Sequence, residues 1–355
     1  MQHIQPQVQI ELKEQILLEQ LKHFAHIEPK EILPPLTGPV WGYRRKARLG
    51  VKYVPQKKKV LVGFREKNGR YLTDMNECAI LHSTVGSRLV DLQALIYKME
   101  ARDSIPQIEV AIGDEASVLI FRHLNPLSEN DTQLLIEFGQ QHTLHIFLQP
   151  GNINSIHALW PVNPKSLSYT LPDFQLTLHF SPADFTQVNM DINREMIKNT
   201  IALLEPTSTD RILDLFCGLG NFTLPLARFC KEIVGVEGAS EMVERAEENA
   251  KLNHLTNTTF YAANLAGNFS EATWAKEQFN KIILDPPRTG ALEIIHHLPV
   301  LGASRIVYVS CNPSTLARDA GILANYGYCL TKVGVMDMFP HTRHVESIAV
   351  FDKKK

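Results

Sequence analysis

Residues 211–222, RILDLFCGLGNF, carry the pattern that decides the fold. An apolar stretch predicts a buried strand over 211–216, and it leads into a turn that contains Gly218 and Gly220. Glycines at a strand-to-helix turn let the backbone approach a ligand closely. The segment therefore predicts a ligand site at the carboxyl end of a parallel strand.

The same alternation of strand and helix patterns continues to the C-terminus, with strands rich in Ile, Val and Leu. Such strands with short connections are typical of a parallel sheet covered on both faces. Strands are predicted at 211–216, 232–237, 258–262, 280–285, 304–309, near 328–336 and 346–352. Helices are predicted at 221–229, 240–254, 270–278, 291–299 and 313–325. The fold class is therefore α/β, with a Rossmann-like, seven-stranded sheet in a domain over 181–355.

An acidic residue, Glu237, ends the second strand, where a ribose hydroxyl pair is normally bound. A dinucleotide fingerprint would have a third glycine where Thr223 stands, which weakens the case for NAD. Asp214, Gly218, Gly220 and Glu237 together suit S-adenosylmethionine (SAM) on a class I methyltransferase sheet. A tight turn in another kind of α/β protein is the alternative.

Two more motifs end later strands, where open α/β sheets build their sites. Asp285-Pro286-Pro287-Arg288 has Arg288 where amino-group methyltransferases usually place an aromatic residue, which points away from exocyclic-amine chemistry. Ser310-Cys311-Asn312-Pro313 places Cys311 at the predicted cofactor site. Most single cysteines are inert and buried, and Cys217, Cys230 and Cys329 are assigned to packing.

A nucleophilic cysteine suits a target carbon that is not nucleophilic by itself, such as C5 of uracil. A thiolate that adds to C6 converts C4–C5 into an enolate, and C5 then accepts a methyl group from SAM. A base must next remove the C5 proton so that the cysteine is eliminated. Glu346, which precedes the last strand, is a candidate, although spacing alone would not select it.

The N-terminal half is organised differently. Residues 8–26 have the apolar spacing of an amphipathic helix, and a proline-rich linker follows up to about residue 40. We expect this 1–40 segment to pack on the catalytic domain. Short strand and helix patterns over 41–180 predict a central α+β domain.

Basic residues concentrate in 41–70, which holds eleven Lys and Arg and one acid, Glu66. The chain as a whole is −2, so the other 325 residues sum to −12. Cations interleaved with aromatic rings are the composition that contact with single-stranded RNA needs. We predict that RNA phosphates are bound by Arg44, Arg45, Lys46 and Arg48. A solvated face of a strand pair is the alternative.

The overall composition is ordinary for a globular protein, with 44% hydrophobic and 21% charged residues. No apolar run approaches the roughly 18 residues that a membrane span needs, and no secretory signal is visible. Five cysteines do not make a disulfide framework, so a cytoplasmic location is expected.

Four motifs resemble the RNA (uracil-5-)-methyltransferase family: DLFCGLGNF (214–222), DPPR (285–288), SCNPSTLARD (310–319) and DMFPHTRHVES (337–347). FSPADFTQVN (180–189) matches the segment that these enzymes place ahead of the sheet. The resemblance covers about 41–353 and is strongest to the 23S rRNA enzymes of the RumA/RlmD type. The tRNA enzymes are the alternative, and a non-catalytic RNA-binding remnant is a second one.

The resemblance implies that Cys311 is the nucleophile and Glu346 the proton-abstracting base. It implies a SAM site formed by Gln187, Phe216, Asn221, Glu237, Asn264 and Asp285. RNA, most closely 23S rRNA, is the implied partner, and neither a membrane nor an obligate protein partner is indicated.

The chain departs from the resembled enzymes in two respects. They carry an N-terminal TRAM β-barrel, which this sequence does not contain. They also hold a [4Fe–4S] cluster on four cysteines, of which only the fourth, Cys78, has a counterpart here. We expect that the cluster cannot be built from this sequence alone.

Overall fold

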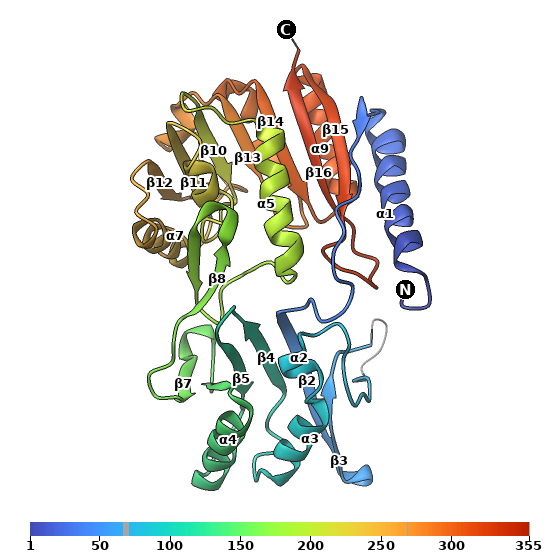
Figure 1. The fold of residues 1–355 in the computed structure, drawn as a ribbon, viewed down its shortest axis with the longest axis vertical. Coiled ribbons are helices and arrows are strands. Elements are labelled where there is room, and N and C mark those ends of the chain that lie inside the picture. The colour runs from blue at the N-terminus through green and yellow to red at the C-terminus, as the bar shows by residue number, and fades with distance from the viewer. Residues whose placement is uncertain (67–70, 268, 355) are drawn as a thin grey trace. The chain divides into compact units, whose positions relative to one another are not determined.

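A computed structural model describes residues 1–66, 71–267 and 269–354 of the chain. They form two compact units (Figure 1). The first unit comprises Met1–Gly38, Thr170–Leu178 and Asp191–Lys355, and the second comprises Pro39–Tyr169 and His179–Met190. The structure groups residues 1–38 with 191–355 in one unit, in line with the expectation that the N-terminal segment packs on the catalytic domain. The functional assignment of 1–40, 41–180 and 181–355 stays a prediction.

The first unit is built on an eight-stranded sheet in the order β1-β15-β16-β14-β13-β10-β11-β12. Its strands are β1 (Glu31–Ile32), β10 (Arg211–Leu215), β11 (Glu232–Glu237), β12 (Thr258–Ala262), β13 (Lys281–Leu284), β14 (Arg305–Ser310), β15 (Tyr328–Met336) and β16 (Glu346–Lys353). All neighbours pair in parallel except β16, which runs antiparallel to β14 and β15. The seven predicted strands are present, and β1 adds an eighth. The Rossmann-like α/β prediction is confirmed.

Helices cover this sheet on both faces (Figure 1). They are α1 (Pro6–Gln20), α5 (Met190–Leu204), α6 (Thr223–Ala227), α7 (Ser240–Leu252), α8 (Leu292–Ile295) and α9 (Pro313–Asn325), with single turns at Leu21–Ala25, Trp274–Lys276 and Leu298–Leu301. Strand residues such as Ile212, Val236 and Ile306 are fully buried, as expected for a sheet with two covered faces.

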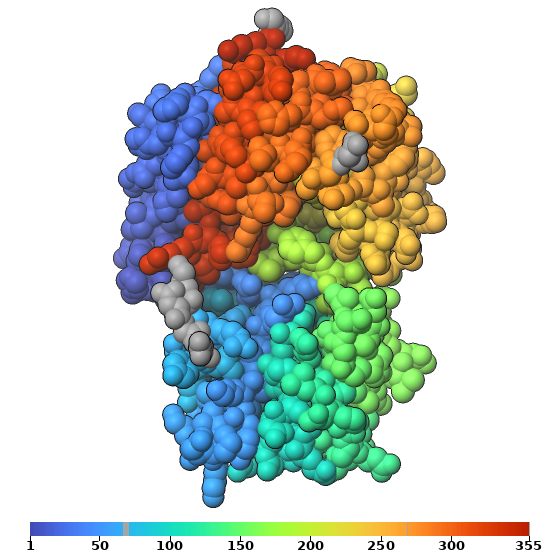
Figure 2. Space-filling view, turned by 180° about the vertical axis from the view of Figure 1, so that it is seen from behind, coloured from blue at the N-terminus to red at the C-terminus, as the bar shows by residue number. Residues whose placement is uncertain are grey.

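The N-terminal helix α1 belongs to the core of this unit. Its Ile10 and Leu17, and Leu21 of the turn that follows, lie in the same hydrophobic cluster as Val333 and Val335 of β15. Figure 2 shows the N-terminal residues, in blue, packed along the C-terminal strands, in red. The N-terminal helix and the C-terminal strands therefore share one hydrophobic core.

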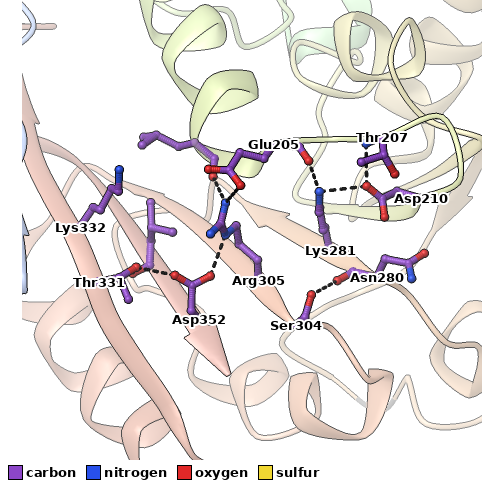
Figure 3. Close-up of polar contacts among 12 residues, drawn as sticks. Glu205, Thr207, Asp210, Asn280, Lys281, Ser304, Arg305, Thr331, Lys332 and Asp352 are labelled. Atoms are coloured by element: carbon purple, nitrogen blue, oxygen red, sulfur yellow. Dashed lines mark hydrogen bonds and ion pairs between the residues drawn. The ribbon is translucent and has the colours of Figure 1, made fainter. Parts of the chain in front are cut away.

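A polar cluster lies at the amino end of the sheet (Figure 3). Arg305 of β14 pairs with Glu205 and with Asp352 of β16, both at 2.7 Å. Lys281 of β13 pairs with Asp210 at 2.9 Å, and Thr331 donates to Asp352 at 2.7 Å. Each carboxylate of the cluster thus has a charged partner.

The second unit holds a six-stranded sheet in the order β3-β2-β4-β5-β6-β7, with only β5 and β6 parallel. Its strands are β2 (Lys46–Val54), β3 (Lys59–Gly63), β4 (Gln107–Ile112), β5 (Ser117–Arg122), β6 (His145–Gln149) and β7 (His157–Trp160). Its helices are α2 (Ser83–Gly86), α3 (Leu89–Lys98) and α4 (Glu129–His142), with single turns at Pro55–Lys57 and Ile153–Ser155. A separate hairpin of β8 (Leu167–Leu171) and β9 (Leu176–Phe180), joined by the turn Pro172–Phe174, occurs where the chain passes between the units. The unit is an α+β module.

Candidate active site

The glycine turn after β10 follows the pattern predicted from its sequence. Gly218 and Gly220 have φ values of 55° and 95°, in the region that glycine adopts without strain. A Cβ atom on Gly220 would lie 2.9 Å from Leu224 of α6. Phe216 also has a positive φ, 64°, which is uncommon for a bulky residue and is found mostly at functional turns. The turn is therefore both tightly packed and strained.

Glu237 ties this turn to β11. One carboxylate oxygen accepts the backbone N–H of Gly218 at 3.1 Å. The other oxygen accepts the N–H groups of Gly238 and Ala239, at 2.7 and 3.2 Å. A carboxylate has about four acceptor positions, so one remains for a ligand hydroxyl. Glu237 is thus fixed in place and still able to bind a ribose.

Asp214, the fourth residue of β10, is completely buried. Its Oδ2 accepts a hydrogen bond of 2.5 Å from the Thr223 hydroxyl, and its Oδ1 has no partner among the described residues. Burial, with a smaller contribution from Asp285 and Glu237, raises the pKa of Asp214 to about 8. An unsatisfied buried carboxylate oxygen is costly unless a donor meets it, and a bound ligand with a cationic or N–H group would supply that donor.

Three other predicted cofactor residues lie in the same unit. Asn221 exchanges two amide hydrogen bonds with Asn193 of α5, at 2.9 and 3.0 Å. Asn264 follows β12 and is exposed, and its Oδ1 accepts the N–H of Ala266 at 3.0 Å. Asp285 follows β13, beside the end of β10, because its N–H donates to the Leu215 carbonyl at 3.3 Å. The structure thus brings these residues to the carboxyl ends of neighbouring strands.

Gln187 belongs to the second unit, so its place in a SAM site stays a prediction. The remaining residues fit SAM: a glycine turn without Cβ atoms, an acid with free acceptor capacity and a buried carboxylate with an unused oxygen. The acceptor capacity of Glu237 suits the ribose of the cofactor, and the unused oxygen of Asp214 suits its amino-acid end.

Cys311 and Glu346 are neighbours because of strand register. β14 and β16 pair antiparallel with Ser310 opposite Ser347, and the Ser347 hydroxyl donates to the Ser310 carbonyl at 3.2 Å. Cys311 directly follows Ser310, and Glu346 directly precedes Ser347, so these two residues come next in the same antiparallel register. Two residues 35 positions apart in the chain are therefore adjacent at the carboxyl end of the sheet, next to Asp285.

Burial dominates the electrostatics of this pair. Glu346 is 4% exposed, and burial, reinforced by the charge of Asp285, raises its pKa well above the ordinary value. Arg288 and Lys13 act in the opposite direction. Burial, together with Glu346 and Asp285, raises the pKa of the Cys311 thiol to about 11, and Arg288 lowers it. Burial thus disfavours the charged form of both groups, and the Cys311 thiol of the ligand-free protein holds its proton at neutral pH.

The DPPR motif joins two of the site loops. The Arg288 carbonyl accepts a hydrogen bond of 3.0 Å from the Asn312 amide, and the Asn312 Oδ1 also caps α9 by accepting the N–H of Ser314. The Arg288 guanidinium lies 3.4 Å from Nδ1 of His344. Asn312 thus holds the loop after β13 against the loop that carries Cys311.

The four predicted RNA-binding residues, all in the second unit, have protein partners. Arg45 pairs with Asp114 at 2.6 Å and Arg48 with Glu109 at 3.1 Å. The Lys46 ammonium donates to the carbonyls of Pro182 and Asp184, and burial lowers its pKa to about 8. Arg44, which precedes β2, forms isolated backbone bridges with Leu81 and Asn189. Residues 67–70 of the basic segment lie outside the described residues.

Cys78 is buried, and its backbone N–H donates to the Gly86 carbonyl at 2.9 Å. In the described part of the chain, no group of three or more His, Cys, Asp or Glu side chains could hold a metal ion. The residues around Cys78 therefore do not fit a [4Fe–4S] cluster by themselves.

None of the described helices has the length and apolar character that crossing a membrane requires.

Comparisons with known proteins agree with this geometry. The family model described as tRNA (uracil-5-)-methyltransferase matches residues 166–355. The chain is 52% identical to the "23S rRNA (uracil(1939)-C(5))-methyltransferase RlmD" of Alcanivorax borkumensis, covering 100% of this chain and 80% of the relative. It is 50% identical to the protein of the same name from Legionella pneumophila, covering 99% of this chain and 80% of the relative.

Among solved structures, the Pyrococcus abyssi tRNA (uracil-54, C5)-methyltransferase with S-adenosyl-L-homocysteine is similar in fold, with a TM-score of 0.76 and 23% identity. The match covers 99% of this chain and 84% of that one. Sequence identity of about half over the full chain is decisive for the family. The chain belongs to the RNA (uracil-5-)-methyltransferase family, enzymes that transfer a methyl group from SAM to C5 of a uracil in RNA.

Proposed function

We propose that this enzyme methylates C5 of one uridine in 23S rRNA, giving 5-methyluridine, through a covalent bond between Cys311 and C6 of the uracil. The substrate is supported by relatives that are about half identical over the whole chain and named for that reaction. An rRNA substrate also supports a cytoplasmic location. The covalent route is supported by one observation above the others, the strand register that sets Cys311 beside Glu346.

Cys311 is proposed as the nucleophile. Its thiolate forms the S–C6 bond, and the electron pair of C5=C6 moves onto the C4 carbonyl as an enolate. C5 of the enolate then gains a methyl group, which bound SAM would supply through cleavage of its S–CH3 bond, leaving S-adenosylhomocysteine. Because the pKa of the free thiol is about 11, the proton of Cys311 must leave as the uracil binds, and Arg288 is the described cation that favours the thiolate.

Glu346 is proposed as the base that completes the reaction. Its carboxylate takes the proton from C5, the electron pair of that C–H bond forms C5=C6, and the C6–S bond breaks to release Cys311 as a thiolate. A carboxylate with a raised pKa is a stronger proton acceptor than an ordinary one, which suits removal of a weakly acidic C–H proton.

Phe216, Asn221, Glu237, Asn264, Asp285 and Gln187 are proposed to bind SAM. Glu237 would accept from the ribose with its remaining acceptor capacity, and Asp285 would face the methionine amino group. Asn264 would meet the adenine edge, and its exposed side chain is accessible for that contact. Asn221 is held by Asn193 and so is oriented before the cofactor arrives.

RNA binding by Arg44, Arg45, Lys46 and Arg48 remains part of the proposal for the second unit. It is supported by the +10 charge of residues 41–70. Arg45 and Arg48 would have to exchange their acid partners for phosphates, and the Arg48 side chain is largely exposed. Replacing both by Gln should weaken rRNA binding and flatten its salt dependence by about 1–2 units of slope, with SAM affinity unchanged.

The substrate is tested with unmodified 23S rRNA and unmodified tRNA, each incubated with the enzyme and methyl-labelled SAM. The label should enter 23S rRNA at one uridine, identified by nuclease digestion and mass spectrometry. The description of the matching family model favours tRNA as the second candidate. Labelling of tRNA in preference to rRNA would establish that candidate, and labelling of neither RNA would support a non-catalytic role.

A further inference from the structure

The N-terminal helix α1 carries two buried polar side chains that the reaction has not yet used. Lys13 and Gln9 are each 1% exposed and lie one helical turn apart, on the face that packs against the sheet. A lysine is almost never fully buried unless it is paired. Both side chains reach the loop of residues 337–345, which joins β15 to β16 and leads directly into Glu346.

The contacts hold this loop at two points. The Lys13 ammonium pairs with Asp337 at 2.6 Å and donates to the Phe339 carbonyl at 3.0 Å. The Gln9 amide accepts the N–H of His341 at 2.9 Å and lies 3.0 Å from the Nδ1 atom of its ring. His341 has a φ of 64°, a strained conformation that persists only where the surroundings fix it.

Stability alone does not account for this arrangement. Replacing a buried ion pair by apolar residues of similar volume is often neutral or stabilising. The neighbouring positions Ile10 and Leu17 are apolar and already bind α1 to the core. Lys13 and Gln9 are therefore not needed to attach the helix, and their contacts instead fix the 337–345 loop.

We propose that Lys13 and Gln9 are positioning residues of the methyl transfer: they fix the 337–345 loop so that Glu346 stays opposite Cys311. This inference rests on the proposed role of Glu346. The charged groups that shift the pKa of Glu346 are Asp285, Arg288 and Lys13. Glu346 in turn raises the pKa of Cys311, and Lys13 is paired with Asp337. Lys13 thus fixes the position of Glu346 and also lowers its pKa, whereas Gln9 only fixes its position.

The two contributions separate in single-turnover experiments with labelled SAM and an rRNA fragment. Gln9→Leu should slow release of methylated RNA about 10- to 100-fold, because the base is misplaced, and should leave the pH profile in place. Lys13→Met should slow release similarly and move the acid limb of the profile to higher pH, since its positive charge lowers the pKa of Glu346. SAM affinity should be native in both variants.

Lys13→Met leaves Asp337 buried without its partner, so the double variant Lys13→Met/Asp337→Asn is prepared to restore folding. Its profile should lie between those of the single variant and the native enzyme, because the cation is absent but the charge of Asp337 is removed with it. Leu17→Ala is the matched control: it lies on the same buried face and should lower the melting temperature without removing a hydrogen bond or ion pair to the loop.

Native release rates in the Gln9 and Lys13 variants, or equal kinetic defects in Leu17→Ala, would overturn the positioning role. Glu346→Gln is measured in parallel. If that variant releases methylated RNA at the native rate, the proposed function of Glu346 fails instead, and the two failures are thereby distinguished.

Discussion

The two ends of the sheet in the first unit treat their acidic residues in opposite ways. At the amino end, burial raises the pKa of Asp210, yet hydrogen bonds from Lys281 and Thr207 outweigh it and bring the pKa below its ordinary value. At the carboxyl end, Asp214 and Glu346 are buried without a cation in direct contact, and burial raises both pKa values. The carboxylate at the amino end is paired with residues of the protein, whereas those at the carboxyl end are left for ligands to pair with.

The difference follows from how a parallel sheet is used. Ligands bind at the carboxyl ends of the strands, so unsatisfied donors and acceptors are retained there. At the amino end no ligand arrives, and an unsatisfied charge would only cost stability. Substitutions at the two ends should therefore affect different quantities, activity at one and stability at the other.

The largest effect is expected at the carboxyl end, from Cys311→Ala. Loss of the nucleophile should reduce kcat/KM for RNA by about 10⁴-fold or more. SAM affinity and the melting temperature should stay native, because the thiol takes no part in the polar network that holds the loops. The measurements are methyl transfer, SAM titration and thermal unfolding. A loss of activity that is accompanied by loss of SAM binding would contradict the assignment.

Glu346→Gln comes next. It should slow product release about 10²- to 10⁴-fold and accumulate methylated RNA bonded to the protein, since addition and methyl transfer precede proton removal. The adduct is detected on a denaturing gel with labelled RNA. A drop in activity without any adduct would instead place Glu346 at an earlier step.

The same variant should be more stable than the native enzyme at neutral pH. The pKa of Glu346 is raised in the folded protein, so its burial costs stability as pH rises above about 4.5, the value in the unfolded chain. Gln has no proton to lose and escapes that cost. The gain in melting temperature should grow as pH rises above 5, and a gain that is constant with pH would contradict the electrostatic account.

At the amino end, Lys281→Met should destabilise the enzyme by about 1–3 kcal/mol, because it leaves the buried Asp210 without its cation. The stability that Asp210 contributes is present above its unfolded pKa of about 3.8 and disappears as pH falls, so the variant and the native enzyme should converge in acid. Below the melting temperature, kcat/KM should be native. A large loss of activity in a folded Lys281→Met enzyme would break the distinction between the two ends.

The smallest effect concerns the reactivity of the free thiol. Because the pKa of Cys311 is about 11, its alkylation by iodoacetamide should rise about tenfold per pH unit between pH 7 and pH 10. Arg288→Gln should slow the reaction several-fold at a given pH, since Arg288 lowers that pKa. Peptide mass spectrometry separates Cys311 from the other four cysteines. A rate that is constant over this pH range would mean that the thiol is already ionised.

Much of this comparison was accessible from the sequence. The apolar segments predicted the strands of the sheet, because a buried parallel sheet has a strong sequence pattern. The Gly218–Gly220 turn predicted a ligand site at the carboxyl end of the first of these strands. Three features were not predicted. Helix α5 was not predicted, although Asn189 directly precedes it, Asp191 lies in its first turn, and its buried Ile192, Met196 and Ile197 have helical spacing. The helix expected at 270–278 is only the turn Trp274–Lys276, where the buried Trp274 ring stacks on Phe269.

The third feature is the role of α1. The sequence predicted an amphipathic helix over 8–26 that packs on the catalytic domain, but it did not single out Lys13 as a buried residue. Its partner Asp337 lies 324 residues away and is brought to it only by the fold. The pairing of Cys311 with Glu346 is similar, since it depends on strand register rather than on any local pattern.

The central claim is that the carboxyl end of the sheet works by a covalent bond to Cys311, and RNA that contains 5-fluorouridine tests it most directly. Fluorine at C5 cannot leave as a cation, so Glu346 cannot complete the reaction and the adduct should persist. After incubation with SAM, tryptic peptides should contain Cys311 bonded to a methylated fluorouracil nucleotide, and Cys311→Ala should give none. A stable adduct on any other residue, or one that survives the Cys311→Ala change, would contradict the account.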